Sequence, residues 1–208
     1  APGVPMLGEE AVAAGRIPEL GEHFFCVDPL DGTRGFARGG GDFTVNIALV
    51  VGGAPRQGVI YAPAIDELYA GEPGCAVCSR GGDALATMAT SLAPPNGIWR
   101  VVASDHSGRD ERTAHFIAAL SGTASHASSS IKLCRIAEGA ADLYPRFGNV
   151  SQWDIAAGHA ILAAAGGDVM SLDAAPLRYG GNDGKFIVPG FVAFANAAAA
   201  SAARTALG

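Results

Sequence analysis

Hydrophobic residues in the first half of the chain fall in short runs that are separated by glycine and proline turns. The longest run, 43–51, is rich in β-branched residues and predicts a strand. Gly52-Gly53 predicts a turn, and 56–61 predicts the returning strand. Segments 67–70 and 76–79 could extend this meander. The pattern therefore predicts an antiparallel sheet in the first half.

The second half alternates between strand-like and helix-like patterns. Strands are predicted at 99–103, 141–147 and 168–171, and helices at 109–120, 130–138 and 153–165. The last two of these helices end at Gly139 and at Gly166-Gly167, in the manner of a helix C-cap. The Ala-rich tail 194–208 predicts a terminal helix.

A weak composition boundary lies at 91–97, which reads Ser-Leu-Ala-Pro-Pro-Asn-Gly. It divides an antiparallel α+β lobe, 1–93, from an α/β lobe, 94–208. We interpret these as two lobes of one layered α+β and α/β sandwich that share one active site, with substrate-binding residues in the second lobe. The 208 residues and 49% hydrophobic content are enough for such a core.

Charge, hydrophobic runs and cysteine spacing argue against a nucleic-acid partner, a membrane helix and a zinc site. A net charge of −6 and the lack of a basic run argue against a nucleic-acid polymer. No uninterrupted apolar segment reaches the roughly 18 residues that a membrane helix needs. A lone Cys75-x-x-Cys78 lacks a second ligand pair at suitable spacing for zinc. We therefore expect Cys75 and Cys78, with Cys26 and Cys134, to be ordinary reduced cysteines of a cytosolic protein.

An apolar run from Phe24 ends abruptly in Asp-Pro-Leu-Asp-Gly-Thr, residues 28–33. An ordinary turn is one interpretation, because Asp, Pro and Gly all favour turns. The functional alternative is a loop, stiffened by proline, that aims Asp28 and Asp31 to one side and exposes the Leu30 carbonyl. Gly32 and Thr33 would then offer backbone N–H groups to a phosphate oxygen, and the Thr33 hydroxyl could orient a water.

Two further carboxylates stand in similar settings. Glu9 follows a glycine and precedes Glu10, and either could be a solvated charge at a strand end. Asp154 lies just before an Ala-rich helix, where Ser151 and Asp154 fit a capping box. Alternatively, carboxylates from three segments could meet and hold magnesium, which prefers oxygen ligands. Two such ions could clamp the attacking water and the leaving oxygen of a phosphate ester.

Several of these stretches carry a family resemblance. Residues 28–33 followed by Phe36, with 153–158, 165–167 and Gly8-Glu9-Glu10, resemble signatures of the inositol monophosphatase superfamily. These are magnesium-dependent, lithium-sensitive phosphatases. The resemblance implies the inositol monophosphatase and fructose-1,6-bisphosphatase-like fold.

Within that superfamily the chain resembles the CysQ branch, the 3'(2'),5'-bisphosphate nucleotidases. The similar stretches are 42–49, 58–63, 129–132, 137–148, 176–179 and Asn196. Leu143 to Gly148, Leu-Tyr-Pro-Arg-Phe-Gly, is the most branch-specific. The implied reaction is removal of the 3'-phosphate from adenosine 3',5'-bisphosphate by metal-activated water, leaving AMP and phosphate, with a role in sulfur assimilation.

The resemblance also implies roles for individual residues. The implied holders of two or more magnesium ions are Glu9, Asp28, the Leu30 carbonyl, Asp31 and Asp154. The implied catalytic residues are Glu9, Asp28 and Thr33, of which Glu9 and Thr33 would position the attacking water. The implied substrate contacts are Leu30, Asp31, Gly32, Thr33, Ser129, Lys132, Arg146 and Asp154.

The residues alone agree with two of these contacts. Lys132 stands beside Ser128 to Ser130 at a predicted helix start, which suits an anion. Arg146 lies at an otherwise apolar strand end, where a charge is either a solvated edge or a ligand contact. A bisphosphate carries more negative charge than an inositol monophosphate, so two extra cations fit it.

The chain departs from the family pattern in three places. Nothing before Glu9 supplies the family's N-terminal helical segment with its Lys-x-Asp motif. Since the chain also begins without Met or a signal-peptide pattern, we expect either an incomplete chain or an incomplete site with exposed apolar surface. Residues 104–107 displace His106 by one position from the family's Ser-Arg-Ser-His, and Ser128 replaces a glycine.

Other functions stay open from the sequence. One is a related phosphatase acting on inositol monophosphate, histidinol phosphate or fructose bisphosphate. Another is a truncated, non-catalytic module that binds phosphate or metal. A small-molecule phosphate ester is the expected partner in each case. The resemblance also implies a homodimer and a cytoplasmic location, with the inner face of a membrane as an alternative.

Overall fold

A computed structural model of the chain describes residues 3–37, 39–41, 43–104, 110–181 and 184–208. His106 lies outside these described residues. The described strands form a seven-stranded sheet, a five-stranded sheet and a two-stranded sheet. The predicted layered combination of sheets and helices is thereby confirmed.

The seven-stranded sheet contains the predicted meander. Its strands follow chain order: β1 (Met6–Gly8), β2 (His23–Asp31), β3 (Thr44–Val51), β4 (Ala54–Ala62), β5 (Glu67–Glu72), β6 (Cys75–Arg80) and β7 (Ala86–Thr87). β1 pairs in parallel with β2, and the later neighbours pair antiparallel. The strand predictions at 43–51, 56–61, 67–70 and 76–79 are confirmed, because β-branched runs separated by glycine turns carry a strong local signal.

The five-stranded sheet belongs to the second half. Its order is β12 (Asp168–Ser171), β14 (Phe191–Phe194), β10 (Leu143–Arg146), β8 (Arg100–Ala103) and β9 (Thr123–His126). β14 runs antiparallel between β12 and β10. The predicted start of the terminal helix at 194 was wrong, since Phe194 ends β14. The division at 93 and 94 into two lobes stays a prediction.

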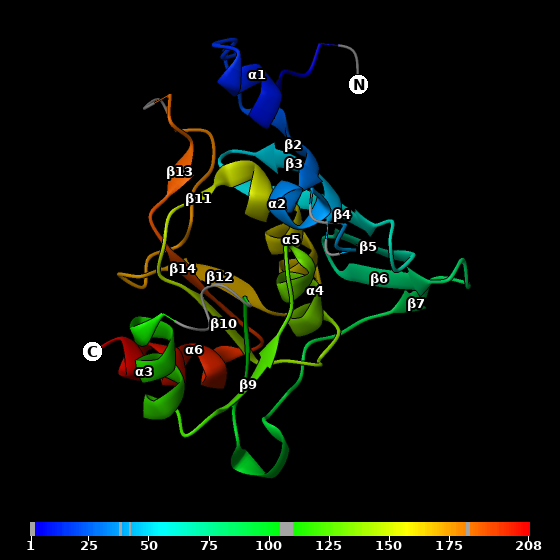
Figure 1. Cartoon of the computed structure of the whole chain (residues 1–208). Helices are drawn as coiled ribbons and strands as arrows, with labels where there is room; N and C mark the ends of the chain where they lie inside the picture. The colour runs from blue at the N-terminus through cyan, green and yellow to red at the C-terminus, as the bar shows by residue number, and fades with distance from the viewer. Residues whose placement is uncertain (1–2, 38, 42, 105–109, 182–183) are drawn as a thin grey trace.

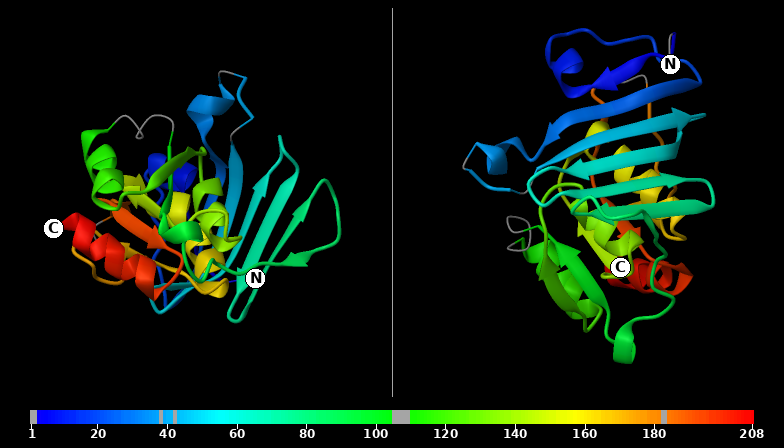
Figure 2. Two further views of the ribbon diagram at one scale, coloured as in Figure 1. Left: turned by 90° about the horizontal axis from the view of Figure 1, so that it is seen from below. Right: turned by 90° about the vertical axis from the view of Figure 1, so that its right-hand side faces the viewer.

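Helices lie between the seven-stranded and the five-stranded sheet and also cover the outer face of the five-stranded sheet. The helices are α1 (Glu9–Ala13), α2 (Thr33–Phe36), α3 (Glu111–Ala119), α4 (Ile131–Ala137), α5 (Gln152–Ala164) and α6 (Ala197–Leu207), with a 3-10 turn at Pro95–Gly97. α4 and α5 lie between the sheets, and α3 and α6 cover the opposite face of the five-stranded sheet (Figures 1 and 2). A short pair, β11 (Val150–Ser151) and β13 (Ile187–Val188), leads into α5.

Glycines let α5 approach the seven-stranded sheet closely. A Cβ added at Gly58 of β4 would lie 2.3 Å from the carbonyl oxygen of Ala157. One added at Gly71 of β5 would lie 2.6 Å from the Cα of Ile161. Real atoms do not approach this closely, so backbone must move if either glycine is replaced. This contact fixes the position of the helix that carries Asp154.

We expect Gly58→Ala to lower the free energy of unfolding by about 2–3 kcal/mol, because the added methyl overpacks a backbone-to-backbone contact. Urea denaturation followed by circular dichroism measures the change. Gly21→Ala is the matched control, since a Cβ there meets nothing within 4 Å. Equal stability of the two variants would show that α5 can move away from β4 at little cost.

The outer face of the seven-stranded sheet exposes apolar side chains. Ile47 and Val59 are 42% and 39% exposed and stand opposite each other on β3 and β4, and Tyr61 is 37% exposed. Among the described helices, none is both long and apolar enough to cross a bilayer. The four cysteines are free thiols, as predicted.

Candidate active site

A β-bulge at the end of β2 brings Asp28 and Asp31 to the same face. Phe24, Cys26 and Asp28 alternate along the buried face of β2. Strict alternation would send Asp31 to the opposite face. The register against β3 shifts by one residue between Asp28 and Asp31, and this extra residue turns Asp31 back toward Asp28. The predicted loop was therefore wrong in form, because both carboxylates belong to the strand.

Asp154 reaches the same place from the first turn of α5. The backbone N–H of Ser151 donates to Asp154 Oδ2 at 3.1 Å, and the two residues form a capping box. The structural interpretation of Asp154 is therefore confirmed. It does not exclude a functional one, because the same carboxylate also faces Asp28 and Asp31.

These three carboxylates form one cluster. Asp28, Asp31 and Asp154 each offer an oxygen, and the three oxygens lie within 4.8 Å of one another. Burial, with the charges of Asp31 and Glu9, raises the pKa of Asp28 to about 6. Burial, with Asp31 and Asp28, raises the pKa of Asp154 to about 8. Since these oxygens repel one another, the cluster suits a hard divalent cation that takes oxygen ligands.

Glu9 borders the cluster from the start of α1. It is exposed and lies outside the three-carboxylate group. Its pKa is nevertheless raised by partial burial, by Glu10 and by Asp31, so its charge senses the cluster. Of the predicted metal-holding carboxylates, the structure thus brings three together and places the fourth at their edge.

The turn after Asp28 arranges the remaining groups predicted in this stretch. The Leu30 N–H donates to Asp28 Oδ1 at 2.9 Å, which fixes the Asp28 side chain. The Leu30 carbonyl accepts a long hydrogen bond of 3.4 Å from the Thr33 hydroxyl. Gly32 has a φ of +92°, a conformation that glycine adopts easily, and α2 begins directly after it.

The predicted substrate contacts from the second half of the chain are Ser129, Lys132 and Arg146. Ser129 donates its hydroxyl proton to Asp31 Oδ2, so this side chain supports a carboxylate. The Lys132 ammonium is buried, donates to the Ser129 carbonyl at 2.7 Å and lies 5.2 Å from the Tyr144 ring centroid. Arg146 Nη2 donates to the Asn149 carbonyl at 3.2 Å.

Two buried polar atoms around the site carry unused hydrogen-bonding capacity. Among the described residues, Asn46 Oδ1 and Arg146 Nε are the buried side-chain atoms without a partner. Unpaired buried polar groups are costly and uncommon, and they often mark functional positions. The Arg146 Nε–H is a donor that an anionic oxygen could satisfy.

The sequence interpretation missed several polar residues that surround the carboxylates. Thr44, Asn46, Ser130 and Tyr144 are all buried. Burial raises the pKa of Tyr144, and the charges of Arg146, Asp31 and Asp154 also act on it, so the phenol lies near the cluster and near Arg146. A signal did exist, because Thr44 and Asn46 occupy inward positions of a strand whose other inward residues, Ala48 and Val50, are apolar.

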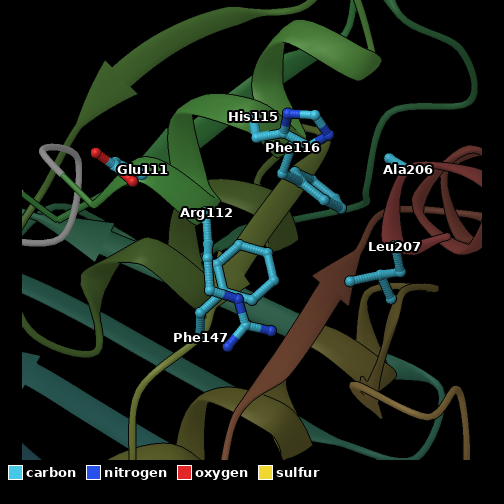
Figure 3. Close-up of a pocket in the computed structure, with 7 residues that line it drawn as sticks. All are labelled: Glu111, Arg112, His115, Phe116, Phe147, Ala206 and Leu207. Carbon is cyan, nitrogen blue, oxygen red and sulfur yellow. The ribbon is translucent and has the colours of Figure 1, made fainter.

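A separate cavity of about 370 Å³ lies between α3, α6 and the residue after β10. It is lined by Glu111, Arg112, His115, Phe116, Phe147, Ala206 and Leu207. The Arg112 guanidinium lies across the Phe147 ring at 4.5 Å from its centroid (Figure 3). This cavity contains one carboxylate, so it lacks the clustered oxygens found at Asp28.

Comparison with known families decides the assignment. The family model described as the inositol monophosphatase family matches residues 1–206. The chain belongs to the inositol monophosphatase family. Asp28, Asp31 and Asp154, whose oxygens lie within 4.8 Å of one another, fall inside the matched range.

Its relatives within the inositol monophosphatase family include proteins named 3'(2'),5'-bisphosphate nucleotidase CysQ. The one from Shigella flexneri is 38% identical over 92% of this chain and 76% of its own length. The one from Salmonella typhimurium is 39% identical over 91% of this chain and 75% of its own length.

Solved structures of inositol monophosphatase family members have the same fold as this chain. CysQ from Bacteroides thetaiotaomicron has a TM-score of 0.79 at 36% identity and covers 93% of this chain and 77% of its own. An inositol monophosphatase from Anabaena has a TM-score of 0.73 at 26% identity, with 98% of this chain and 78% of its own covered. The fold predicted from the resemblance is confirmed.

Proposed function

We propose that this protein is a magnesium-dependent phosphatase that removes the 3'-phosphate from adenosine 3',5'-bisphosphate, giving AMP and phosphate. The observation that carries the proposal is the convergence of Asp28, Asp31 and Asp154 within 4.8 Å. The proteins named bisphosphate nucleotidase that match over most of the chain support this substrate over an inositol phosphate.

The residues of the cluster have separable tasks in this proposal. Asp28, Asp31 and Asp154 would hold magnesium, with the Leu30 carbonyl and Glu9 at the edge completing the oxygen set. Bound magnesium supplies positive charge that stabilises the phosphoryl oxygens and lowers the pKa of a water. Glu9 and Thr33 would orient the attacking water, and the backbone N–H groups of Gly32 and Thr33 would hold a phosphate oxygen.

The substrate's second phosphate requires cations away from the metal ligands. Arg146 stands on β10 two residues after Tyr144, whose phenol is close enough to Arg146, Asp31 and Asp154 for their charges to act on its pKa. Its unpaired Nε–H is available to a phosphate oxygen. Lys132 would act from the start of α4, where its ammonium donates to the Ser129 carbonyl at 2.7 Å, and Ser129 would contact the substrate beside it.

We expect Arg146→Gln to raise KM for adenosine 3',5'-bisphosphate by about 10- to 100-fold, because a hydrogen bond to a charged group contributes roughly 1.5–3 kcal/mol. KM for 3'-AMP, which lacks the second phosphate, should change much less. Steady-state phosphate release with both esters measures the split. Arg56→Gln, at an exposed position of β4, is the matched control. An equal KM increase for both esters would remove Arg146 from recognition of the second phosphate.

A substrate panel tests the proposed function itself. Phosphate release is measured from adenosine 3',5'-bisphosphate, inositol 1-phosphate and fructose 1,6-bisphosphate, with magnesium and with EDTA. This chain and any longer natural form are assayed in parallel. Preference for the nucleotide supports the proposal, and preference for another ester moves the protein to a sister branch. A longer form that is inactive on all three would leave only a binding module.

Three finer expectations belong to the same proposal and rest on the resemblance. Lithium should inhibit phosphate release, the protein should act in the cytoplasm within sulfur assimilation, and it should form a homodimer. Inhibition by lithium chloride against a potassium chloride control, cell fractionation, and light scattering would test them in turn.

A further inference from the structure

Asp31 is held on one side by donors from a distant part of the chain. Its Oδ2 accepts the Ser129 hydroxyl and the backbone N–H of Ser130 at 2.9 Å, and Ser130 Oγ also lies 2.9 Å away. Within the described residues, the hydrogen bonds to the Asp31 side chain end on Oδ2. Its other oxygen, Oδ1, is therefore the one left for a cation.

Thr44 and Asn46 of β3 hold these two serines in turn. Thr44 Oγ1 lies 2.7 Å from Ser129 Oγ. Because Ser129 gives its single hydroxyl proton to Asp31, Thr44 must be the donor in this pair. Asn46 Nδ2 donates to Ser130 Oγ at 2.9 Å, which leaves the Ser130 proton for its acceptors, Asp31 Oδ2 and the Asp154 carbonyl.

The strand register places Thr44 and Asn46 directly beside the metal-holding carboxylates. Thr44 stands opposite Asp31, and Asn46 stands opposite Asp28. Such cross-strand neighbours have Cβ atoms about 5 Å apart on the same face of a sheet. The bulge between Asp28 and Asp31 is thus paired with Thr44 and Asn46 of β3. The hydrogen bonds from Thr44 to Ser129 and from Asn46 to Ser130 therefore both begin on β3.

Fold stability alone does not account for these side chains. Thr44 and Asn46 are fully buried at 0% exposure, in positions where a strand normally carries apolar residues. Asn46 also leaves Oδ1 buried without a partner among the described residues, which costs free energy. Buried polar residues that lower the stability of a fold are expected where they support a functional site.

We propose that Thr44 and Asn46 are positioning residues, which orient the Asp31 carboxylate through Ser129 and Ser130 so that Oδ1 faces the cation. The inference deepens the proposed function and rests on it for the identity of that cation. Neither residue touches the reacting atoms. Partners that orient a metal ligand typically contribute about 10- to 100-fold to metal affinity or activity.

Thr44→Val and Thr44→Ser separate the hydroxyl from the shape of the side chain. Valine keeps the volume and removes the donor, whereas serine keeps the donor. We expect calorimetric titration with magnesium to give a Kd raised about 10-fold or more for Thr44→Val and changed less than about twofold for Thr44→Ser. Phosphate release at saturating magnesium should follow the same order.

Asn46→Leu provides a second test that a folding defect cannot imitate. Leucine has a similar volume and removes the unpaired oxygen, so the metal-free protein should unfold in EDTA at an equal or higher urea concentration. Its magnesium Kd should nevertheless rise about 10-fold or more. Wild-type magnesium affinity in both Thr44→Val and Asn46→Leu would overturn the inference, and so would a wild type that binds no magnesium.

The affinity readout keeps this inference apart from the proposed function. If the wild-type protein binds magnesium but hydrolyses none of the esters, the proposed function fails. The comparison of Kd values among the variants would still decide whether Thr44 and Asn46 position Asp31.

Discussion

Asp28→Asn is expected to lower kcat/KM for adenosine 3',5'-bisphosphate by about 10³-fold while making the metal-free protein more stable. A metal ion stabilises transition-state charge by several kcal/mol, and about 1.4 kcal/mol corresponds to a tenfold change in rate. Asp28 is buried at 1% exposure and lies among the other carboxylates, so removing its charge removes both a ligand and a source of repulsion.

The gain in stability follows from the same electrostatics. Burial raises the pKa of Asp28 to about 6, so the ionised carboxylate is disfavoured in the folded chain without metal. Removing it should stabilise the protein in EDTA by on the order of 2 kcal/mol near pH 8. Urea denaturation in EDTA and phosphate release in magnesium are measured on the same preparation. Asp83→Asn, at an exposed position, is the control and should change neither.

The pattern of opposite effects is what distinguishes a metal site from a structural cluster. An Asp28→Asn protein that loses activity and also loses stability in EDTA would indicate that Asp28 mainly supports the fold. Activity close to that of the wild type would remove Asp28 from the metal-holding set.

The metal-free protein is expected to lose stability as pH rises, and magnesium should abolish that loss. The raised pKa values of Asp28, about 6, and Asp154, about 8, mean that both groups keep their protons more readily when folded. Their contribution is fully present below the ordinary carboxyl pKa near 4 and is lost as pH rises through about 6 and then about 8. The loss should be a few kcal/mol in all, because the two groups titrate as a pair.

Carboxylates with lowered pKa values change the stability of the protein only below this pH range. Arg100 holds the pKa of Asp142 below its ordinary value, and His159 does the same for Asp168. Their stabilisation is present above the ordinary carboxyl pKa and is lost only at lower pH. Between about pH 5 and pH 9 the slope in EDTA therefore reports on the carboxylates with raised pKa values, which are Asp28, Asp154 and, at the edge of the cluster, Glu9.

Unfolding free energies in EDTA and in excess magnesium, at several pH values, check this expectation. Magnesium needs ionised ligands, so its stabilising effect should grow with pH. Asp28→Asn should flatten the EDTA profile. A metal-free stability that rises between about pH 5 and pH 9 would contradict the repulsion attributed to the carboxylates.

Local patterns in the sequence predicted much of the fold and singled out the three carboxylates that the structure brings together. The run at 43–51 and its glycine turn predicted β3 and β4, and the structure has them at Thr44–Val51 and Ala54–Ala62. The capping box predicted the start of α5 and the place of Asp154. These signals are strong because periodicity, turns and caps depend on neighbouring residues.

Features that depend on distant pairing were not predictable. Proline in Asp-Pro-Leu-Asp suggested a loop, but the bulge that aligns Asp28 and Asp31 is defined only by the register against β3. β14, Phe191–Phe194, was not predicted, because Phe194 continues into an Ala-rich stretch that favours a helix, although the strand lies inside a sheet.

Dependence on distant pairing also explains why the residues that support Asp31 were not predicted. Ser129 and Asp31 are 98 positions apart, and Asn46 and Ser130 are 84 apart. An alternation of inward and outward residues shows that Asn46 is buried, but it does not show which partner it meets. The predicted role of Ser129 as a substrate contact stays a prediction, since its hydroxyl is bonded to Asp31 here.

The most direct test of the central claim is the fate of adenosine 3',5'-bisphosphate in ¹⁸O-labelled water with magnesium. Hydrolysis at the carboxylate cluster predicts 5'-AMP and phosphate that carries one ¹⁸O atom from water, with no product in EDTA or from Asp28→Asn. Mass spectrometry of the phosphate and chromatography of the nucleotide give both answers. Unlabelled phosphate, 3'-AMP as the product, or unchanged release in EDTA would contradict the account.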